Sequence, residues 1–322
     1  MDNFNRKLSK ISSKPLTRND NLPLRILREL ASPFHGTIGS YLRPTYSDIA
    51  KKLGVDEETV RVRFRQAQKS GSIIGWQIAI NPSLLGRKAT SVLLEVNDPS
   101  TKPTMISQIK LIDEVILIMD FYENPLRVVF NHENDRDMER RLALIRAICG
   151  DKSSIAWQVG FAPCYAKLKK TDWEILKVLH EDPMQSNAEI AKELRVSART
   201  VKRRISFMTE TKAIYSFARG NVNRMPGMAY FFLLDCANEK KKHEVDEIIL
   251  ARLENAIYVD TRNKQYSTYS AVFRNVSEAD EVYRWIKSLD GGEKTRMSMM
   301  REIISVPDWF DKEIDKHLNE SG

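Results

Sequence analysis

Hydrophobic positions recur at helical spacing in the stretch from Ser197 to Met208. Val201, Ile205 and Met208 follow the i, i+4, i+7 rule of one buried helical stripe. Ser197 is a favourable N-cap for this helix. A shorter amphipathic segment at residues 187–196 precedes it, with a tight connection between the two. Two short helices joined by a tight turn predict a helix-turn-helix, a motif that lays its second helix in the major groove of DNA.

The same pattern occurs a second time, 141 positions earlier in the chain. That shift aligns Ile49 with Ile190 and continues without a gap through the second helix of the motif. A match this dense indicates an internal duplication. In the earlier copy Asp56 caps the second helix. Residues 71–80 then alternate like a strand pair, so we expect a small β-hairpin that completes a winged helix-turn-helix.

Each helix-turn-helix is followed by strands and helices in the order β-α-β-β-α-β. This order predicts a ferredoxin-like antiparallel sheet with both helices on one face. We expect the two open sheet faces to cover each other, so that the copies form an internal pseudo-dimer. The expected strands are 89–96, 115–122, 126–131 and 155–161, then 228–236, 257–261, 268–273 and 295–304, with helices 105–112, 135–148, 243–253 and 278–289.

The predicted fold class is therefore α+β, with two winged helix-turn-helix domains that are each followed by a ferredoxin-like domain. Residues 32–44 are an insertion in the first helix-turn-helix, and residues 307–318 form a C-terminal helix expected to dock on its own domain. The expected divisions are a flexible basic arm at 1–20, helix-turn-helix domains at 21–86 and 166–222, and sheet domains at 87–165 and 223–322.

The amino-acid composition indicates a polyanionic partner. The 322 residues carry a formal net charge of +8 and a pI of about 9.2, which favours nucleic acid. The three cysteines are far apart and form no C-x-x-C motif, which argues against a disulfide framework or a zinc site. No apolar run is long enough to span a bilayer, and the first residues lack a hydrophobic signal core. We expect a cytoplasmic protein without cofactor, metal or membrane contact.

The candidate DNA-binding residues come from the second helix of each copy, mainly from the side opposite its apolar stripe. In the first copy, Asp56, Glu57 and Glu58 occupy the first turn, where acids repel phosphate, so we expect the second copy to dominate. Arg63 and Arg204 flank the buried stripe and are assigned to packing or ion pairing. The alternative for the remaining cations is a solvated helix face. The predicted DNA-binding residues are Arg199, Thr200, Lys202, Arg203 and Ser206, with Arg61, Arg65 and Lys69 from the first copy.

Three stretches of the chain resemble the Lrp/AsnC family of leucine-responsive transcriptional regulators. Thr171-Asp172 and the apolar positions after it are similar to the family's opening helix. Residues 187–205 resemble its E-I-A…L…V-S…T-V…R-I signature, and residues 71–86 its wing and exit. The resemblance implies a sequence-specific regulator that binds double-stranded DNA, with sheet domains of the RAM type. Family members usually carry one such unit and dimerise, whereas this chain holds both; the family's glycine-rich effector loop has no clear counterpart here.

Two other functions fit the same architecture. Siroheme decarboxylases share the duplicated scaffold, and such a tetrapyrrole enzyme would place histidines in the cleft of the sheet domains. The five histidines of this chain are scattered, and we therefore expect no catalytic residue and no enzymatic activity. An assembly partner without DNA affinity is the other alternative. The operator, the sign of regulation, an amino-acid effector and further self-association stay open. Residues that could line a cleft, but fit strands better, are Tyr258, Arg262, Tyr266 and Tyr269.

Overall fold

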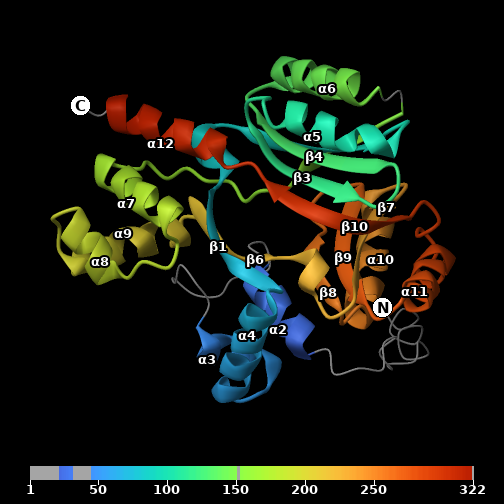
Figure 1. The fold of residues 1–322 in the computed structure, drawn as a ribbon, viewed down its shortest axis with the longest axis horizontal. Coiled ribbons are helices and arrows are strands. Elements are labelled where there is room, and N and C mark those ends of the chain that lie inside the picture. Colours follow the sequence, from blue (N-terminus) through green and yellow to red (C-terminus); the bar gives the residue numbers. More distant parts are fainter. Residues whose placement is uncertain (1–21, 32–44, 151–152, 321–322) are drawn as a thin grey trace.

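The computed structural model describes residues 22–31, 45–150 and 153–320. The basic arm expected at residues 1–20 and the insertion at 32–44 lie outside these residues. Within the described part of the chain, no helix is long and apolar enough to cross a membrane. The chain contains two helix-turn-helix (HTH) units and two sheet units, in the predicted order (Figure 1).

In both HTH units, the second helix of the helix-turn-helix motif begins at the predicted N-cap residue. The Asp56 carboxylate accepts a hydrogen bond from the Thr59 amide at 2.7 Å, and the Ser197 hydroxyl accepts one from the Thr200 amide at 3.0 Å. Both caps satisfy an amide that has no partner inside the helix. HTH unit 1 consists of α2 (Leu22–Ala31), α3 (Tyr46–Leu53) and α4 (Glu57–Ser70), and HTH unit 2 of α7 (Lys170–Glu181), α8 (Asn187–Glu193) and α9 (Ala198–Glu210).

The two sheet units have the same strand order, β5-β2-β4-β3 and β10-β7-β9-β8. This is the ferredoxin-like order, so the predicted α+β fold is confirmed. Sheet unit 1 contains β2 (Lys88–Glu95), α5 (Lys102–Ile109), β3 (Val115–Phe121), β4 (Pro125–His132), α6 (Asp135–Cys149) and β5 (Ile155–Val159). Sheet unit 2 contains β7 (Met228–Asp235), α10 (Glu239–Arg252), β8 (Ala256–Asp260), β9 (Tyr266–Phe273), α11 (Val276–Ser288) and β10 (Arg296–Ser305). Short 3-10 helices precede β2, α5 and β7, at Pro82–Leu85, Pro99–Thr101 and Val222–Arg224.

The sheet units contact each other in two ways. Their inner faces pack together as expected, with the rings of Phe121 and Phe231 5.7 Å apart. In addition, β10 pairs with β7 along its first half and with β3 along its second half, which joins all eight strands into one sheet. The register of β10 on β3 shifts between Met300 and Glu302. The pseudo-dimer is therefore held by apolar packing and by backbone hydrogen bonds.

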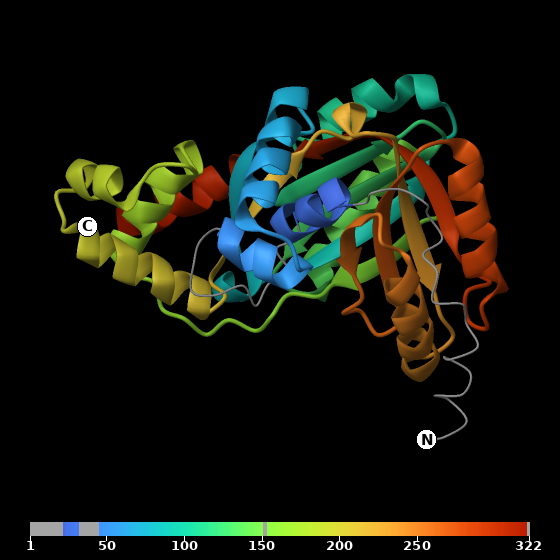
Figure 2. The same ribbon diagram turned by 90° about the horizontal axis from the view of Figure 1, so that it is seen from below.

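The strand that follows α4 does not form the expected hairpin. Residues 71–80 contain a single strand, β1 (Ile73–Ile80), which pairs antiparallel with β6 (Ile214–Gly220) of HTH unit 2. The prediction was wrong because period-2 alternation identifies a strand but not its partner. Gly75 lies beside a register shift in this strand. The two-stranded ribbon links the HTH units directly (Figure 2).

The C-terminal helix α12 (Asp308–Glu320) packs on α7 of HTH unit 2, so its expected docking on sheet unit 2 was also wrong. The His317 ring stacks on Trp173 with centroids 4.1 Å apart. Glu313 lies 2.9 Å from Arg87, at the start of sheet unit 1. The cause is the path of β10, which continues from β7 to β3 and releases the chain beside HTH unit 2 (Figure 1).

Candidate nucleic-acid interface

Helix α9 is fixed by an apolar stripe on its inner side. Val201, Ile205 and Met208 are buried and belong to one hydrophobic cluster with α7, α8 and α12. The spacing that predicted the helix therefore also predicted its buried face. This packing leaves the opposite side of α9 in solvent.

The exposed side of α9 carries unpaired positive charge. Arg199, Lys202 and Arg203 are all exposed, and their side chains have no ion pair or hydrogen bond among the described residues. Thr200 and Ser206 are half-buried, and the Thr200 hydroxyl lies 2.9 Å from the Ser197 hydroxyl within the cap. Three cations without counter-ions can each neutralise a phosphate or donate to a base edge.

A fourth cation of α9 has a structural role, as predicted. The Arg204 guanidinium binds the Asp172 carboxylate of α7 through two hydrogen bonds, with Nε 2.5 Å from Oδ1. Asp172 is fully buried, and this carboxylate raises the pKa of Arg204. Arg204 also lies over the ring of Phe207 at 4.5 Å. The bidentate pair joins α9 to α7.

In α4, the corresponding helix of HTH unit 1, one of the predicted DNA-binding cations makes ion pairs within its own helix. Arg61 makes ion pairs with Glu57 and Glu58, both at 2.6 Å. The acids that we expected to repel phosphate therefore also neutralise one of the predicted DNA contacts. The i, i+4 and i, i+3 spacing of these residues is the signal that the sequence analysis overlooked. Arg65 and Lys69 are exposed, without side-chain partners among the described residues.

Arg63 of α4 is the counterpart of Arg204 and makes a hydrogen bond within its own helix. Its Nη1 donates to the Gln66 side chain at 3.3 Å, and α2 has no acid in its first turn. The bidentate pair with the buried Asp172 carboxylate thus gives Arg204 the ion-pairing role that was predicted for it.

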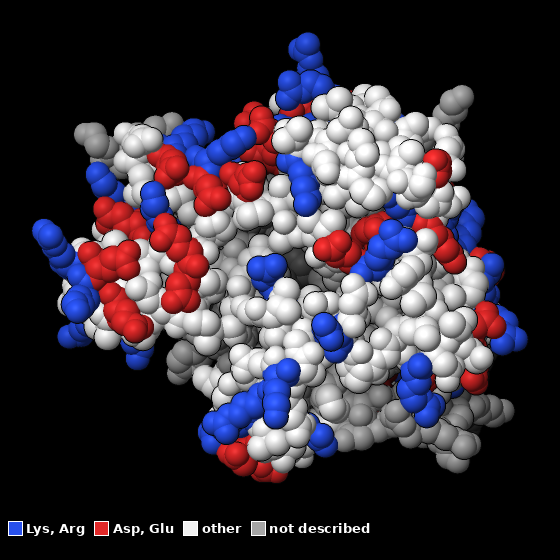
Figure 3. Space-filling model, viewed as in Figure 1, with Lys and Arg blue, Asp and Glu red and all other residues white. Residues whose placement is uncertain are grey.

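Basic side chains are distributed unevenly over the two HTH units. Figure 3 shows them gathered over α3 and α4 in the lower lobe, and at the outer rim of the lobe formed by α7, α8 and α9. Acidic side chains gather on the face of that second lobe that is turned toward the viewer. On the face shown, HTH unit 2 therefore presents mainly acidic side chains, with basic ones at its rim.

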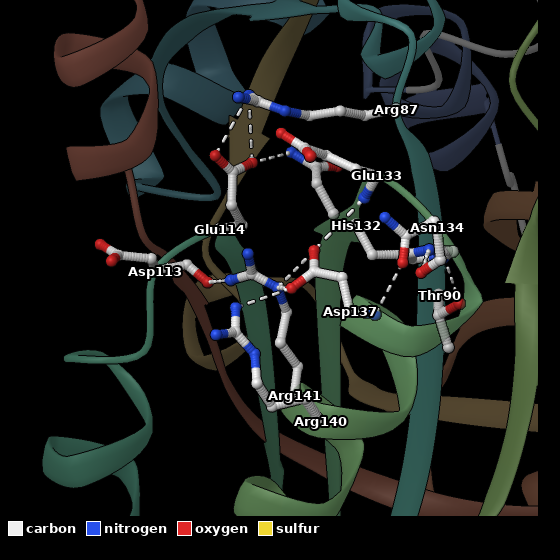
Figure 4. Close-up of polar contacts among 11 residues, drawn as sticks. Arg87, Thr90, Asp113, Glu114, His132, Glu133, Asn134, Asp137, Arg140 and Arg141 are labelled. Carbon is white, nitrogen blue, oxygen red and sulfur yellow. Dashed lines mark hydrogen bonds and ion pairs between the residues drawn. The ribbon is translucent and has the colours of Figure 1, made fainter.

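The described histidines are distributed over the chain. His132, His180, His243 and His317 lie on four different elements. His132 is enclosed by sheet unit 1, with Nε2 3.0 Å from the Thr90 hydroxyl and Nδ1 3.3 Å from the Asn134 carbonyl oxygen (Figure 4). Burial lowers the pKa of His132. The contacts of this ring are those of a core residue.

Two of the tyrosines considered for a cleft, Tyr266 and Tyr269, contact other side chains of the two sheet units. The Tyr269 hydroxyl is buried and donates to Asp246, which also binds Lys242 at 2.6 Å. The Tyr266 ring packs 5.8 Å from Trp157 across the two sheet units. A separate cleft of about 580 Å³ opens where the sheet units meet. Its polar lining includes Glu95 and Arg296, 3.8 Å apart, which the sequence analysis did not single out.

Comparisons with known proteins show what HTH unit 2 is similar to. Residues 168–208 match the AsnC-type helix-turn-helix domain. The transcriptional regulator Ptr1 of Methanocaldococcus jannaschii is 30% identical over 97 residues, which are 30% of this chain and 60% of that protein. An uncharacterized HTH-type transcriptional regulator of Pyrococcus horikoshii is 27% identical over 139 residues, 43% of this chain and 94% of that one.

One solved structure matches almost the whole fold. The siroheme decarboxylase NirDL superposes with a TM-score of 0.54 and 13% identity, covering 94% of this chain and 99% of that one. At this identity the likeness concerns the duplicated scaffold. The chain thus contains an AsnC-type helix-turn-helix domain, is similar over part of its length to HTH-type transcriptional regulators, and carries two copies of the HTH and sheet units in one polypeptide.

Proposed function

We propose that this protein is a transcriptional regulator that binds specific sequences in double-stranded DNA, with α9 as the main recognition helix. One observation carries the proposal: Arg199, Lys202 and Arg203 are exposed, lack counter-ions among the described residues, and lie opposite the buried stripe of a helix-turn-helix. Such a helix places cations and hydroxyl donors against phosphates and base edges.

HTH unit 1 assists this binding through Arg65 and Lys69. Because Glu57 and Glu58 hold Arg61, this unit has fewer cations available in the first turns of its helix. Thr200 and Ser206 add neutral hydrogen-bonding groups to α9. An amino-acid effector and association of several chains would be further properties of the same regulator, to be tested by ligand titration and a sizing measurement.

A DNA-binding titration tests the proposal. A protein-binding selection from a random duplex pool first provides the DNA, and fluorescence anisotropy then measures the affinity at several salt concentrations. We expect a steep loss of affinity with salt. In 0.15 M salt, Arg199→Ala/Lys202→Ala/Arg203→Ala should weaken binding on the order of 100-fold, because three phosphate neutralisations are removed.

A matched triple variant separates site from net charge. Lys240, Lys287 and Lys294 are exposed on sheet unit 2, and their replacement by Ala removes the same charge far from α9. This control should bind like the wild type. Equal loss in both triple variants, or wild-type binding by the α9 variant, would refute the assignment to α9. Binding of an iron tetrapyrrole in place of any duplex would support the enzyme instead.

A further inference from the structure

The turn before α9 contains a cation in an unusual backbone conformation. Arg195 has φ +55°, in the left-handed region that residues other than glycine rarely adopt. The side chain of Arg195 is exposed and has no partner among the described residues. It lies two positions before Ser197, the N-cap of the proposed recognition helix.

The duplicate shows which residue this turn favours. Gly54 occupies the equivalent position in HTH unit 1, with φ +69°. Both turns are closed by the same hydrogen bond, from Val55 to the Ala50 carbonyl and from Val196 to the Ala191 carbonyl, each 3.0 Å long. A side chain at Gly54 would meet no atom within 4 Å. The geometry of the turn is therefore the same, and arginine adopts it with a backbone strain that glycine avoids.

Helix electrostatics gives a weaker reason for the arginine. A cation after the last turn of a helix interacts favourably with its negative end. Helix α8 already has Lys192 in its last turn. Glycine would end the helix without strain, as it does in HTH unit 1.

We propose that Arg195 is a DNA-phosphate contact, retained in a strained conformation because it places a cation beside the N-terminus of α9. There it would bind the backbone that borders the groove, next to Arg199. The contact rests on the proposed DNA binding by HTH unit 2 and extends that interface from the helix into the turn. Strain at a binding residue is tolerated where the rest of the structure fixes the conformation.

The substitution Arg195→Gly tests both parts of this inference. In 0.15 M salt we expect roughly fivefold weaker binding to the selected duplex, and a salt dependence whose slope falls by about 0.9, because one phosphate contact is lost. The same variant should melt roughly 2 °C higher, since glycine relieves the left-handed strain. Arg195→Lys keeps the charge and should retain the affinity of the wild type within about twofold.

The chain provides a matched control at the other end of α9. Lys212 also has a left-handed backbone, with φ +59°, where HTH unit 1 has Gly71 with φ +78°. Its side chain is half-buried. Lys212→Gly should therefore raise the melting temperature by a similar amount while the DNA affinity stays within about twofold of wild type.

The outcomes separate the inference from the function on which it rests. Arg195→Gly that melts higher and binds DNA like the wild type would overturn the phosphate contact. Equal losses of affinity in Arg195→Gly and Lys212→Gly would also overturn it, since backbone flexibility would then be the cause. Wild-type protein that binds no duplex even at low salt would overturn the proposed function itself, and the contact with it.

Discussion

The two HTH units share a backbone plan but use their charged residues in opposite ways. In HTH unit 1, acids at the start of α4 hold Arg61. In HTH unit 2 the first turn of α9 has no acid. Arg204 of α9 instead makes an ion pair with the buried Asp172 of α7. Duplication thus preserved the caps, the turn and the apolar stripe, while the exposed positions diverged. HTH unit 2 therefore holds α9 in place through a buried ion pair and exposes unpaired cations. HTH unit 1 neutralises one of its own exposed cations, Arg61.

The units also differ in what supports them. Helix α2 packs on β8 and β6. Its buried residues belong to the same hydrophobic cluster as the inner faces of the two sheet units. Helix α7 packs on α12, which connects to sheet unit 1 through Arg87 and Glu313. HTH unit 1 is therefore part of the central core, whereas HTH unit 2 belongs to a separate cluster that includes α12, the ribbon and Cys164, with Leu84 and Ile116 packed against it. Figure 2 shows this second lobe extending away from the sheets.

The largest predicted difference between the units concerns the buried ion pair. Asp172→Asn leaves Arg204 without its carboxylate and should destabilise HTH unit 2 by about 2–3 kcal/mol, somewhat less than for a fully buried pair because Arg204 keeps some exposure. Denaturant unfolding and DNA affinity should both report the change. The matched variant in HTH unit 1, Gln66→Ala, should shift stability by less than about 0.5 kcal/mol. Similar effects at the two sites would contradict the contrast.

An intermediate effect should follow from releasing Arg61. Glu57→Gln/Glu58→Gln removes two acids from the first turn of α4 and frees the guanidinium for phosphate. We expect roughly fivefold tighter DNA binding in 0.15 M salt and a steeper salt dependence. Glu244→Gln/Glu247→Gln on α10 makes the same change in net charge and serves as the control. If both pairs tighten binding equally, net charge and not Arg61 is responsible.

The smallest predicted difference is in the response of the two caps to acid. Hydrogen bonds from the Thr59 hydroxyl and amide lower the pKa of Asp56 below 3.8. The cap of α4 is therefore fully formed above pH 3.8 and is lost as the pH falls through the lower, folded-state pKa. NMR should show the Thr59 amide shift following this titration. The Thr200 amide, bonded to the neutral Ser197, should not follow it.

Local patterns in the sequence predicted most of the fold. Caps, helical stripes and alternating strands depend on residues within a few positions of each other, so the order of elements and the duplication could be read directly. The role of Arg204 was predictable for the same reason, because its position beside the stripe of α9 is set by helical geometry. The predicted contacts Arg199, Lys202 and Arg203 were found exposed on one side of α9.

The tertiary structure decided everything that depends on a distant partner. The sequence predicted a hairpin at residues 71–80, but the fold makes one strand of them, β1, and pairs it with β6. Only the fold extends β10 from β7 to β3. That extension places α12 on HTH unit 2. The left-handed backbone of Arg195 likewise appears only once the turn is built. Periodicity specifies which face of an element is buried, whereas long-range packing determines what covers it.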